Sequence, residues 1–381
     1  MPETSANPAA TAVAARPPFF ADFYTFKWSE FHLRLPLVSA SAVALCLFVG
    51  ILAGHPGGGL IAGGGAFTIG FGANQRIADS RLIPMIVGIF ACSTATLAGT
   101  VAGHKDYWLM IAACASALIY GVLTTRDAGL SWVGQQASVA LLVSSAFPTG
   151  PKPALIRAGL IAAGGIVQVL ITSAGLRLIP NLRKDLVSIA VSVVNTIQEQ
   201  DQEELLRRIR ELSRSLQPLT AAAAFGYSLR LVITTAIATE VYRRLGIQSG
   251  YWIAMTALVV QKPTLSETLT RSSARILGTL LGAWLGSLLI AHVVPGNVVL
   301  ASVAAIFALL AFATNSVNYG LFSVSLTGYI VFLLALNQIP GPVIAHRRAW
   351  CTALGGLIAL LVHLDALVRN RSAGAQRREQ P

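Results

Sequence analysis

The residues best suited to chemistry in this sequence are three cations that follow a short apolar segment. The segment GYWIAMTALVV ends at Gln261 and gives way to Lys262, and two arginines follow at Arg271 and Arg275. A guanidinium group can bind a carboxylate through two parallel hydrogen bonds, and an ammonium group attracts one as a point charge. The three cations therefore predict a binding site for an organic anion. For the two arginines, ordinary anchoring at a membrane surface is an equally weighted interpretation.

The same segment opens on Tyr251 and Trp252, which we assign to substrate binding as aromatic walls for a ring. The pair resembles Tyr107 and Trp108 earlier in the chain. Aromatic side chains of this kind are typical of membrane interfaces, so both pairs are also expected at the outer one.

Few acidic residues lie where they could carry a coupling proton. The candidates are Glu240, Asp79 and Asp365, and buried acids in membranes are functional by default. All three lie near the end of an apolar segment, and Glu240 precedes Arg243 and Arg244 by three and four residues. A structural ion pair is the favoured interpretation for Glu240.

The composition requires these residues to be positioned by membrane-spanning helices. Of the 381 residues, 54% are hydrophobic and only 12% are charged, and the mean hydropathy is +0.66. Soluble domains carry about 25% charged residues. The net charge of +12 lies at the ends of apolar segments, which argues against nucleic-acid binding. The four cysteines lie within apolar segments, and the sequence holds no metal, nucleotide or paired-carboxylate motif. We therefore expect no enzyme activity and no cofactor.

Hydropathy predicts an all-α polytopic membrane protein with about twelve transmembrane helices. The predicted spans are 35–54, 58–73, 82–102, 107–124, 131–147, 154–176, 225–245, 250–262, 274–293, 297–313, 318–336 and 343–367. This pattern divides the chain into an N-terminal tail (1–34), a first six-helix repeat (35–180), a helical linker (181–224), a second six-helix repeat (225–368) and a C-terminal tail (369–381). About three quarters of the Lys and Arg residues fall on the side of both termini. The tails and linker are therefore predicted to be cytoplasmic, in a multi-pass plasma-membrane protein.

The two halves resemble each other weakly. LIAGGGAFTIGFGANQRIADSRLIPMIVG (60–88) aligns with GYWIAMTALVVQKPTLSETLTRSSARILG (250–278), which pairs Arg81 with Arg271 and Gly88 with Gly278. Six spans in each half predict two parallel repeats. A short or glycine-interrupted segment at matching positions of two repeats indicates a transport site, because broken helices leave backbone groups that need partners. After the break, glycines at 278, 282 and 286 predict close helix packing.

The motif YWIAMTALVV followed by QKPTLSETLTRSSARILGTLLGAWLG resembles the signature of the fusaric-acid-resistance-like membrane proteins, which include the aromatic acid exporters of bacterial inner membranes. The residues that match are Tyr251, Trp252, Pro263, Arg271, Arg275, Gly278 and Thr279. The first half departs from this signature, because GGGLIAGGG replaces the Tyr-Trp opening. The resemblance implies proton-driven efflux of aromatic carboxylic acids, and by family analogy a periplasmic adaptor or a homo-oligomer.

We therefore expect an inner-membrane secondary transporter, embedded in the lipid bilayer, that exports aromatic carboxylic acids or related organic anions. Efflux of this kind would contribute to drug resistance. An organic-anion channel of the same architecture is one alternative. A membrane scaffold that docks partners through residues 181–224 is another.

Overall fold

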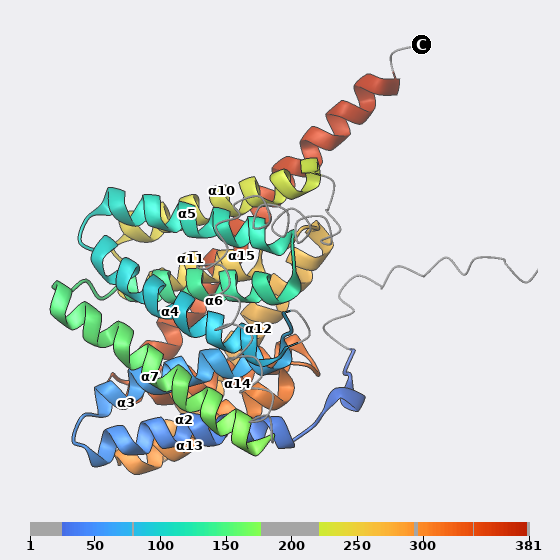
Figure 1. The fold of residues 1–381 in the computed structure, drawn as a ribbon. Coiled ribbons are helices and arrows are strands. Elements are labelled where there is room, and N and C mark those ends of the chain that lie inside the picture. The colour runs from blue at the N-terminus through green and yellow to red at the C-terminus, as the bar shows by residue number, and fades with distance from the viewer. Residues whose placement is uncertain (1–24, 78–79, 177–220, 293–295, 338, 379–381) are drawn as a thin grey trace, which may run out of the picture.

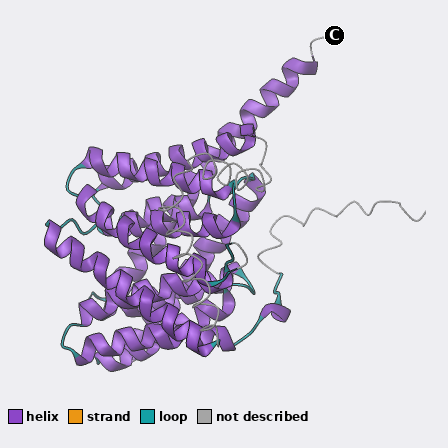
Figure 2. Cartoon of the chain, in the orientation of Figure 1, coloured by secondary structure: helices purple, strands orange, loops and turns teal. Residues whose placement is uncertain are grey.

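The computed structural model describes residues 25–77, 80–176, 221–292, 296–337 and 339–378, and these ranges are built almost entirely from helices (Figure 2). Their only β-type pairing is an isolated bridge between Ile77 and Ser80. The all-α fold class is therefore confirmed. The predicted linker helices of 181–220 and most of the N-terminal tail lie outside the described residues.

The first half begins with a 3-10 turn, η1 (Trp28–Glu30). Its helices are α2 (Arg34–Leu52), α3 (Pro56–Gly70) with the 3-10 turn η2 (Phe71–Asn74), α4 (Leu82–Ala102), α5 (Asp106–Thr124), α6 (Ala128–Ser145) and α7 (Pro151–Gly175). The helices of the second half are α10 (Ala221–Leu245), α11 (Tyr251–Val260), α12 (Leu265–His292), α13 (Asn297–Thr314), α14 (Tyr319–Ala335) and α15 (Gly341–Arg378). Each predicted apolar segment coincides with one of these helices.

Six of the described helices are long and apolar enough to cross a membrane, namely α2, α4, α5, α7, α12 and α13. The apolar helices α11 and α14 are shorter than this criterion requires. The chain is thus a helical membrane protein, and twelve crossings remain a prediction. Helix α12 starts at Leu265, well before the predicted start at 274, because its first turns carry polar and charged side chains that a hydropathy pattern excludes.

The helices lie side by side in a bundle, and both described ends of the chain leave it on the same side (Figure 1). Within the first half, α4 packs on α6 and α7, and α3 packs on α2 and α7. Within the second half, α12 packs on α14 and α15, and α11 packs on α10 and α15. The halves meet where α10 contacts α5 and where α13 contacts α2.

Glycines allow α12 to approach α14 closely. A Cβ added at Gly282 would lie 2.4 Å from the carbonyl oxygen of Val324, and one at Gly278 would lie 2.5 Å from the Cβ of Ser323. The predicted glycine stripe therefore does form a close helix contact. The glycines of α3 serve the same purpose, since a Cβ at Gly65 would lie 2.5 Å from the carbonyl oxygen of Ile161 in α7. The sequence suggested that these glycines interrupt the helix. In the structure, α3 is continuous as far as Gly70 and only then tightens into η2.

A stacked aromatic cluster joins the two halves. The ring of Phe67 in α3 lies 4.2 Å from that of Tyr329 in α14 and 5.1 Å from that of Phe312 in α13, measured between centroids. Phe71 of η2 lies 4.6 Å from Phe312. Rings in these geometries stabilise a contact beyond their buried area. The two halves consequently share one core.

Candidate anion-binding site

The short helix α11 lies inside the protein. Every one of its residues except Val259 is buried, and it packs against α10, α15 and α6. Tyr251 and Trp252 are only 5% and 3% exposed. They are therefore enclosed by neighbouring helices and are not the exposed interfacial anchors that the sequence predicted. Tyr107 and Trp108, at the start of α5, are more than half exposed.

The chain segment between α11 and α12 is bonded to neighbouring side chains. The Lys262 N–H donates to the hydroxyl oxygen of Thr268 at 2.9 Å, and the Tyr227 hydroxyl donates to the carbonyl oxygen of Gln261 at 3.3 Å. Irregular backbone inside a membrane domain needs such partners. These groups of the break thus find their partners within the protein itself.

Two of the predicted cations lie beside this break. Lys262 and Arg271 are half-buried and close enough to repel each other electrostatically. The Arg271 guanidinium lies 4.6 Å from the centre of the Tyr319 ring, a cation–π contact between α12 and α14. We name Lys262 and Arg271 the inner pair.

Arg275 lies one turn further along α12 and is buried, with 4% of its surface exposed. Its Nε has no hydrogen-bond partner among the described residues. The same face of α12 thus carries one arginine at the edge of the bundle and a second one in its interior.

A fourth cation, Arg348 of α15, was not among the residues predicted from the sequence. Arg348 is 1% exposed and donates from Nη2 to the Thr327 hydroxyl oxygen at 3.3 Å, while its Nε and Nη1 lack partners within the described ranges. Its guanidinium lies 5.1 Å from the centre of the Trp252 ring and close enough to Arg275 for electrostatic repulsion. We name Arg275 and Arg348 the deep pair.

The signal for Arg348 was present in the sequence. Arg348 lies inside the predicted span 343–367, and a charge within an apolar span marks a functional position by default. Because it is adjacent to Arg347, a count of Lys and Arg at span ends instead groups it with the loop cations. In the structure, Arg348 is buried, whereas Arg347 is partly exposed.

The structure therefore divides the five predicted binding residues into two groups. Lys262 and Arg271 form the inner pair, whereas Tyr251, Trp252 and Arg275 gather deeper around Arg348. Among the described residues, no acidic side chain forms a salt bridge with any of these four cations. Burying an uncompensated charge costs several kcal/mol, so the arrangement favours an anion near the deep pair.

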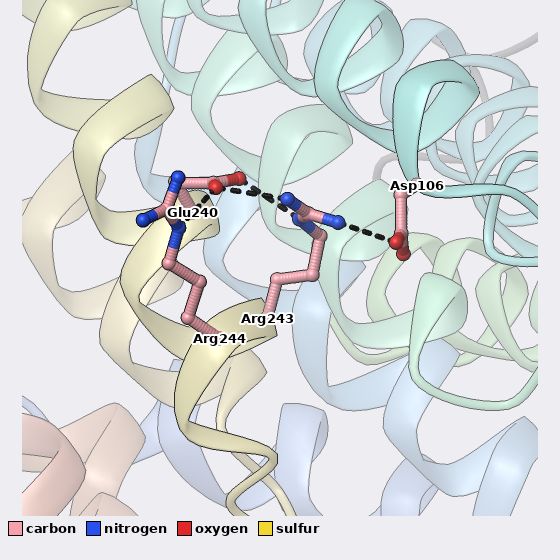
Figure 3. A network of polar contacts seen from close by, with 4 residues as sticks. All are labelled: Asp106, Glu240, Arg243 and Arg244. Carbon is pink, nitrogen blue, oxygen red and sulfur yellow. Dashed lines mark hydrogen bonds and ion pairs between the residues drawn. The ribbon is translucent and has the colours of Figure 1, made fainter.

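The proton-coupling candidate Glu240 is held in an ion network (Figure 3). Its carboxylate accepts from Nε and Nη2 of Arg243, both at 2.8 Å, and from Nε of Arg244 at 2.6 Å. Arg243 also pairs with Asp106, so the network joins the end of α10 to the start of α5. Both oxygens of Glu240 are occupied, as in the structural ion pair that the sequence favoured.

The other two coupling candidates lie outside the described side chains. Asp79 falls in the gap at 78–79, and Asp365 belongs to a part of α15 whose side chains are not described. In the described remainder of the chain, no group of three or more His, Cys, Asp or Glu side chains is placed to hold a metal ion.

Comparison with known proteins shows a family similarity in the second half. Residues 223–362 match the family described as "Fusaric acid resistance protein-like". The chain is 30% identical to the inner membrane protein YccS of Escherichia coli over 151 residues, which cover 39% of this chain and 20% of YccS. No solved structure matches.

Two uncharacterized proteins are also similar. One is ORF2 of Neisseria gonorrhoeae, at 29% identity over 34% of this chain and 33% of that protein. The other is slr1298 of Synechocystis, at 27% identity over 35% of this chain and 18% of that protein. The matched part of the chain spans a third or less of the length of these three relatives. Residues 223–362, which hold both the inner pair and the deep pair, thus match the fusaric acid resistance protein-like family that the Tyr251–Thr279 motif resembles.

Proposed function

We propose that the protein is an inner-membrane secondary transporter that exports aromatic carboxylic acids or related organic anions. The observation that carries the proposal is the course of cations along α12, from the half-buried Arg271 to the buried Arg275. Among the described residues, no acidic side chain forms a salt bridge with either arginine. In a membrane domain, such charges favour an anionic ligand over a purely structural role.

The inner pair, Lys262 and Arg271, would receive the anion at the cytoplasmic mouth. The distribution of Lys and Arg supports a cytoplasmic position for both termini, and the similarity to YccS supports the inner membrane. Tyr319 supports Arg271 through its ring, so the guanidinium is held in place before a ligand arrives. The buried rings of Tyr251 and Trp252 would contact the aromatic part of the substrate deeper in the domain.

We infer further that the two halves are parallel repeats. The packing pairs α4–α6, α4–α7 and α3–α7 of the first half correspond in order to α12–α14, α12–α15 and α11–α15 of the second. In the same correspondence, α2 matches α10 and α5 matches α13. The contact between halves at α5–α10 is therefore the counterpart of the one at α2–α13. Helix α3 and helix α11 also end at aligned residues, 70 and 260. Transporters with such repeats place the substrate near the middle of the membrane.

Proton coupling would require an acid that changes its protonation state during transport. Glu240 is engaged by two arginines, so Asp79 and Asp365 become the preferred candidates. A homo-oligomer or a periplasmic adaptor would complete the export route, by analogy with the family that the second half matches.

Flux through proteoliposomes tests the proposal. The full chain is reconstituted, a pH gradient is imposed, and movement of labelled 4-hydroxybenzoate is followed for the native protein and for Arg271→Gln. Arg126→Gln is the control, because Arg126 is exposed on the loop after α5. Gradient-dependent flux that falls in Arg271→Gln and persists in Arg126→Gln supports export. Step currents without a pH gradient would instead indicate a channel, and absence of flux for every aromatic acid tried would refute transport.

A further inference from the structure

Arg348 has the features of a ligand-binding residue that is buried before any ligand arrives. It is the largest of the fully buried side chains in the described structure. Of its guanidinium nitrogens, Nη2 reaches Thr327, whereas Nε and Nη1 are without partners in the described ranges. Buried polar groups in folded proteins are hydrogen-bonded in the large majority of cases, so two unpartnered nitrogens on one buried cation require a reason.

A second buried cation strengthens the case. Arg275 lies within electrostatic range of Arg348 and has its own unpartnered Nε. Two like charges near each other in an apolar interior repel, and no described acid offsets them. Asp365 does not serve either, because it follows Arg348 by seventeen residues in the same helix and is thus displaced from it by almost five helical turns. An anion at Arg348 would relieve the repulsion and satisfy its free donors.

The helices around the deep pair also carry buried hydroxyls without partners. Thr279 follows Arg275 by one turn of α12, Ser323 packs against Gly278, and Thr256 packs against Gly355 of α15. The hydroxyls of these three residues are buried and unpartnered among the described atoms. Hydroxyl groups donate to carboxylates, so these helices carry further donors in addition to the two arginines.

Trp252 lies against Arg348 on the side of α11. Its ring lies 5.1 Å from the Arg348 guanidinium carbon and 5.4 Å from the ring of Tyr251. Cation–π contact orients the guanidinium, and the two rings, inclined at 59° to each other, provide apolar surface beside it. This combination suits a carboxylate attached to a planar ring better than a small inorganic anion.

The corresponding positions in the first half are apolar. The alignment of 60–88 with 250–278 places Met85 opposite Arg275, and the same register places Ala158 of α7 opposite Arg348. Met85 and Ala158 are both buried. The deep pair therefore belongs to one half only, and packing of the repeat does not itself require a cation at either position.

We propose that Arg348 and Arg275 form a carboxylate-binding site in the interior of the second half, separate from the inner pair and bordered by Trp252. The proposal deepens the proposed function, on which it rests, by assigning the site at which the transported acid is held. Arg348 would donate to the carboxylate from one of its free nitrogens, Nε or Nη1, together with the second hydrogen of Nη2, because these are the pairs that present parallel N–H bonds. Arg275 would contribute the second positive charge.

Ligand-dependent thermal stability of the purified full chain tests the site without measuring flux. Benzoate should raise the Tm of the native protein by roughly 3–5 °C at about a hundred times its Kd, because it binds only the folded state. Neutral benzamide should not. Arg348→Gln should lower benzoate affinity at least about 30-fold. Arg347→Gln, the adjacent and partly exposed arginine, should keep the native response.

The basal Tm separates binding from structure. If Arg348 serves a ligand, its buried charge is uncompensated in the ligand-free protein and destabilises it. Removing that charge in Arg348→Gln should therefore leave the Tm equal to or higher than that of the native protein. If Arg348→Gln does not fold, Arg348→Lys retains the charge, lacks the bidentate fork, and should fold with weakened benzoate binding. A lower basal Tm in Arg348→Gln with an intact benzoate response would overturn the proposal. Equal stabilisation by chloride and benzoate would overturn the assignment to a carboxylate.

The binding site and the export function can be refuted independently of each other. Benzoate binding that depends on Arg348, without flux in proteoliposomes, would retain the site and refute export. Flux of 4-hydroxybenzoate that is unchanged in a folded Arg348→Gln protein would retain export and refute the site.

Discussion

The guanidinium of Arg348 lies against the indole ring of Trp252, with 5.1 Å between the guanidinium carbon and the ring centre, and both side chains are buried. The contact joins α15 to the short helix α11. An apolar helix of ten residues in the interior of the domain thus brings an aromatic ring to a cation that has no acidic partner in the described structure.

Replacing Trp252 should therefore weaken anion binding in a graded way. Trp252→Phe retains a weaker cation–π contact, and Trp252→Leu removes it. We expect the affinity for benzoate to fall from Trp to Phe to Leu, by about 2- to 30-fold over the series. Isothermal titration calorimetry measures the three values. Equal affinities in Trp252→Leu and the native protein would remove Trp252 from the site.

The hydroxyl of Thr268 should hold the break between α11 and α12 together. It accepts from the Lys262 N–H at 2.9 Å and donates to the Thr264 carbonyl at 2.9 Å. Thr268→Val should destabilise the protein by about 1–2 kcal/mol, because it leaves a partly buried backbone donor unpaired.

Thr270→Val is the matched control for this change. The Thr270 hydroxyl donates only to the Ser266 carbonyl within the same helix. Thermal unfolding in detergent compares the two variants, and equal effects would show that the break does not depend on Thr268.

The close contact between α12 and α14 makes a third prediction. The methyl group of Gly282→Ala would lie 2.4 Å from the Val324 carbonyl oxygen, so this change should destabilise the protein by about 1–3 kcal/mol. Gly64→Ala, in helix α3, meets no atom within 4 Å and should be neutral or stabilising by up to about 1 kcal/mol. Chemical or thermal unfolding of both variants provides the comparison. A neutral Gly282→Ala would mean that the two helices can separate at no cost.

The network at the end of α10 predicts a structural role for Glu240. Because Arg243 and Arg244 occupy both of its oxygens, Glu240→Gln should lower stability and leave the pH dependence of flux unchanged. Flux measured at a series of imposed pH gradients tests this. Loss of the gradient dependence in a stably folded Glu240→Gln protein would restore Glu240 as the coupling acid.

Much of the fold follows from the sequence, and the reason is physical. Apolar segments bounded by glycine, proline and charge identify helices well, because the bilayer interior forces backbone groups to pair within each segment. Helix α4 begins at Leu82 and ends at Ala102, the residues predicted for it. The start of α12 was predicted too late, because its polar first turns are not required to be apolar.

The site was only partly predictable. The spacing of Arg271 and Arg275 along one helix face is a local property, so the sequence reveals it. Arg348 reaches Arg275 only because α15 packs on α12, and that contact joins residues more than seventy positions apart. Burial of Tyr251 and Trp252 likewise depends on α10 and α15 enclosing α11, whereas the composition of α11 alone fits an interfacial segment equally well.

A structure with a heavy-atom ligand tests the central claim most directly. The full chain is saturated with 4-iodobenzoate, and the iodine position is read from anomalous scattering or from the density map. We predict the carboxylate within about 3 Å of Arg348 nitrogens, beside Arg275, with the ring against Trp252. An iodobenzoate molecule bound elsewhere, with the two guanidinium groups free of it, would contradict the account.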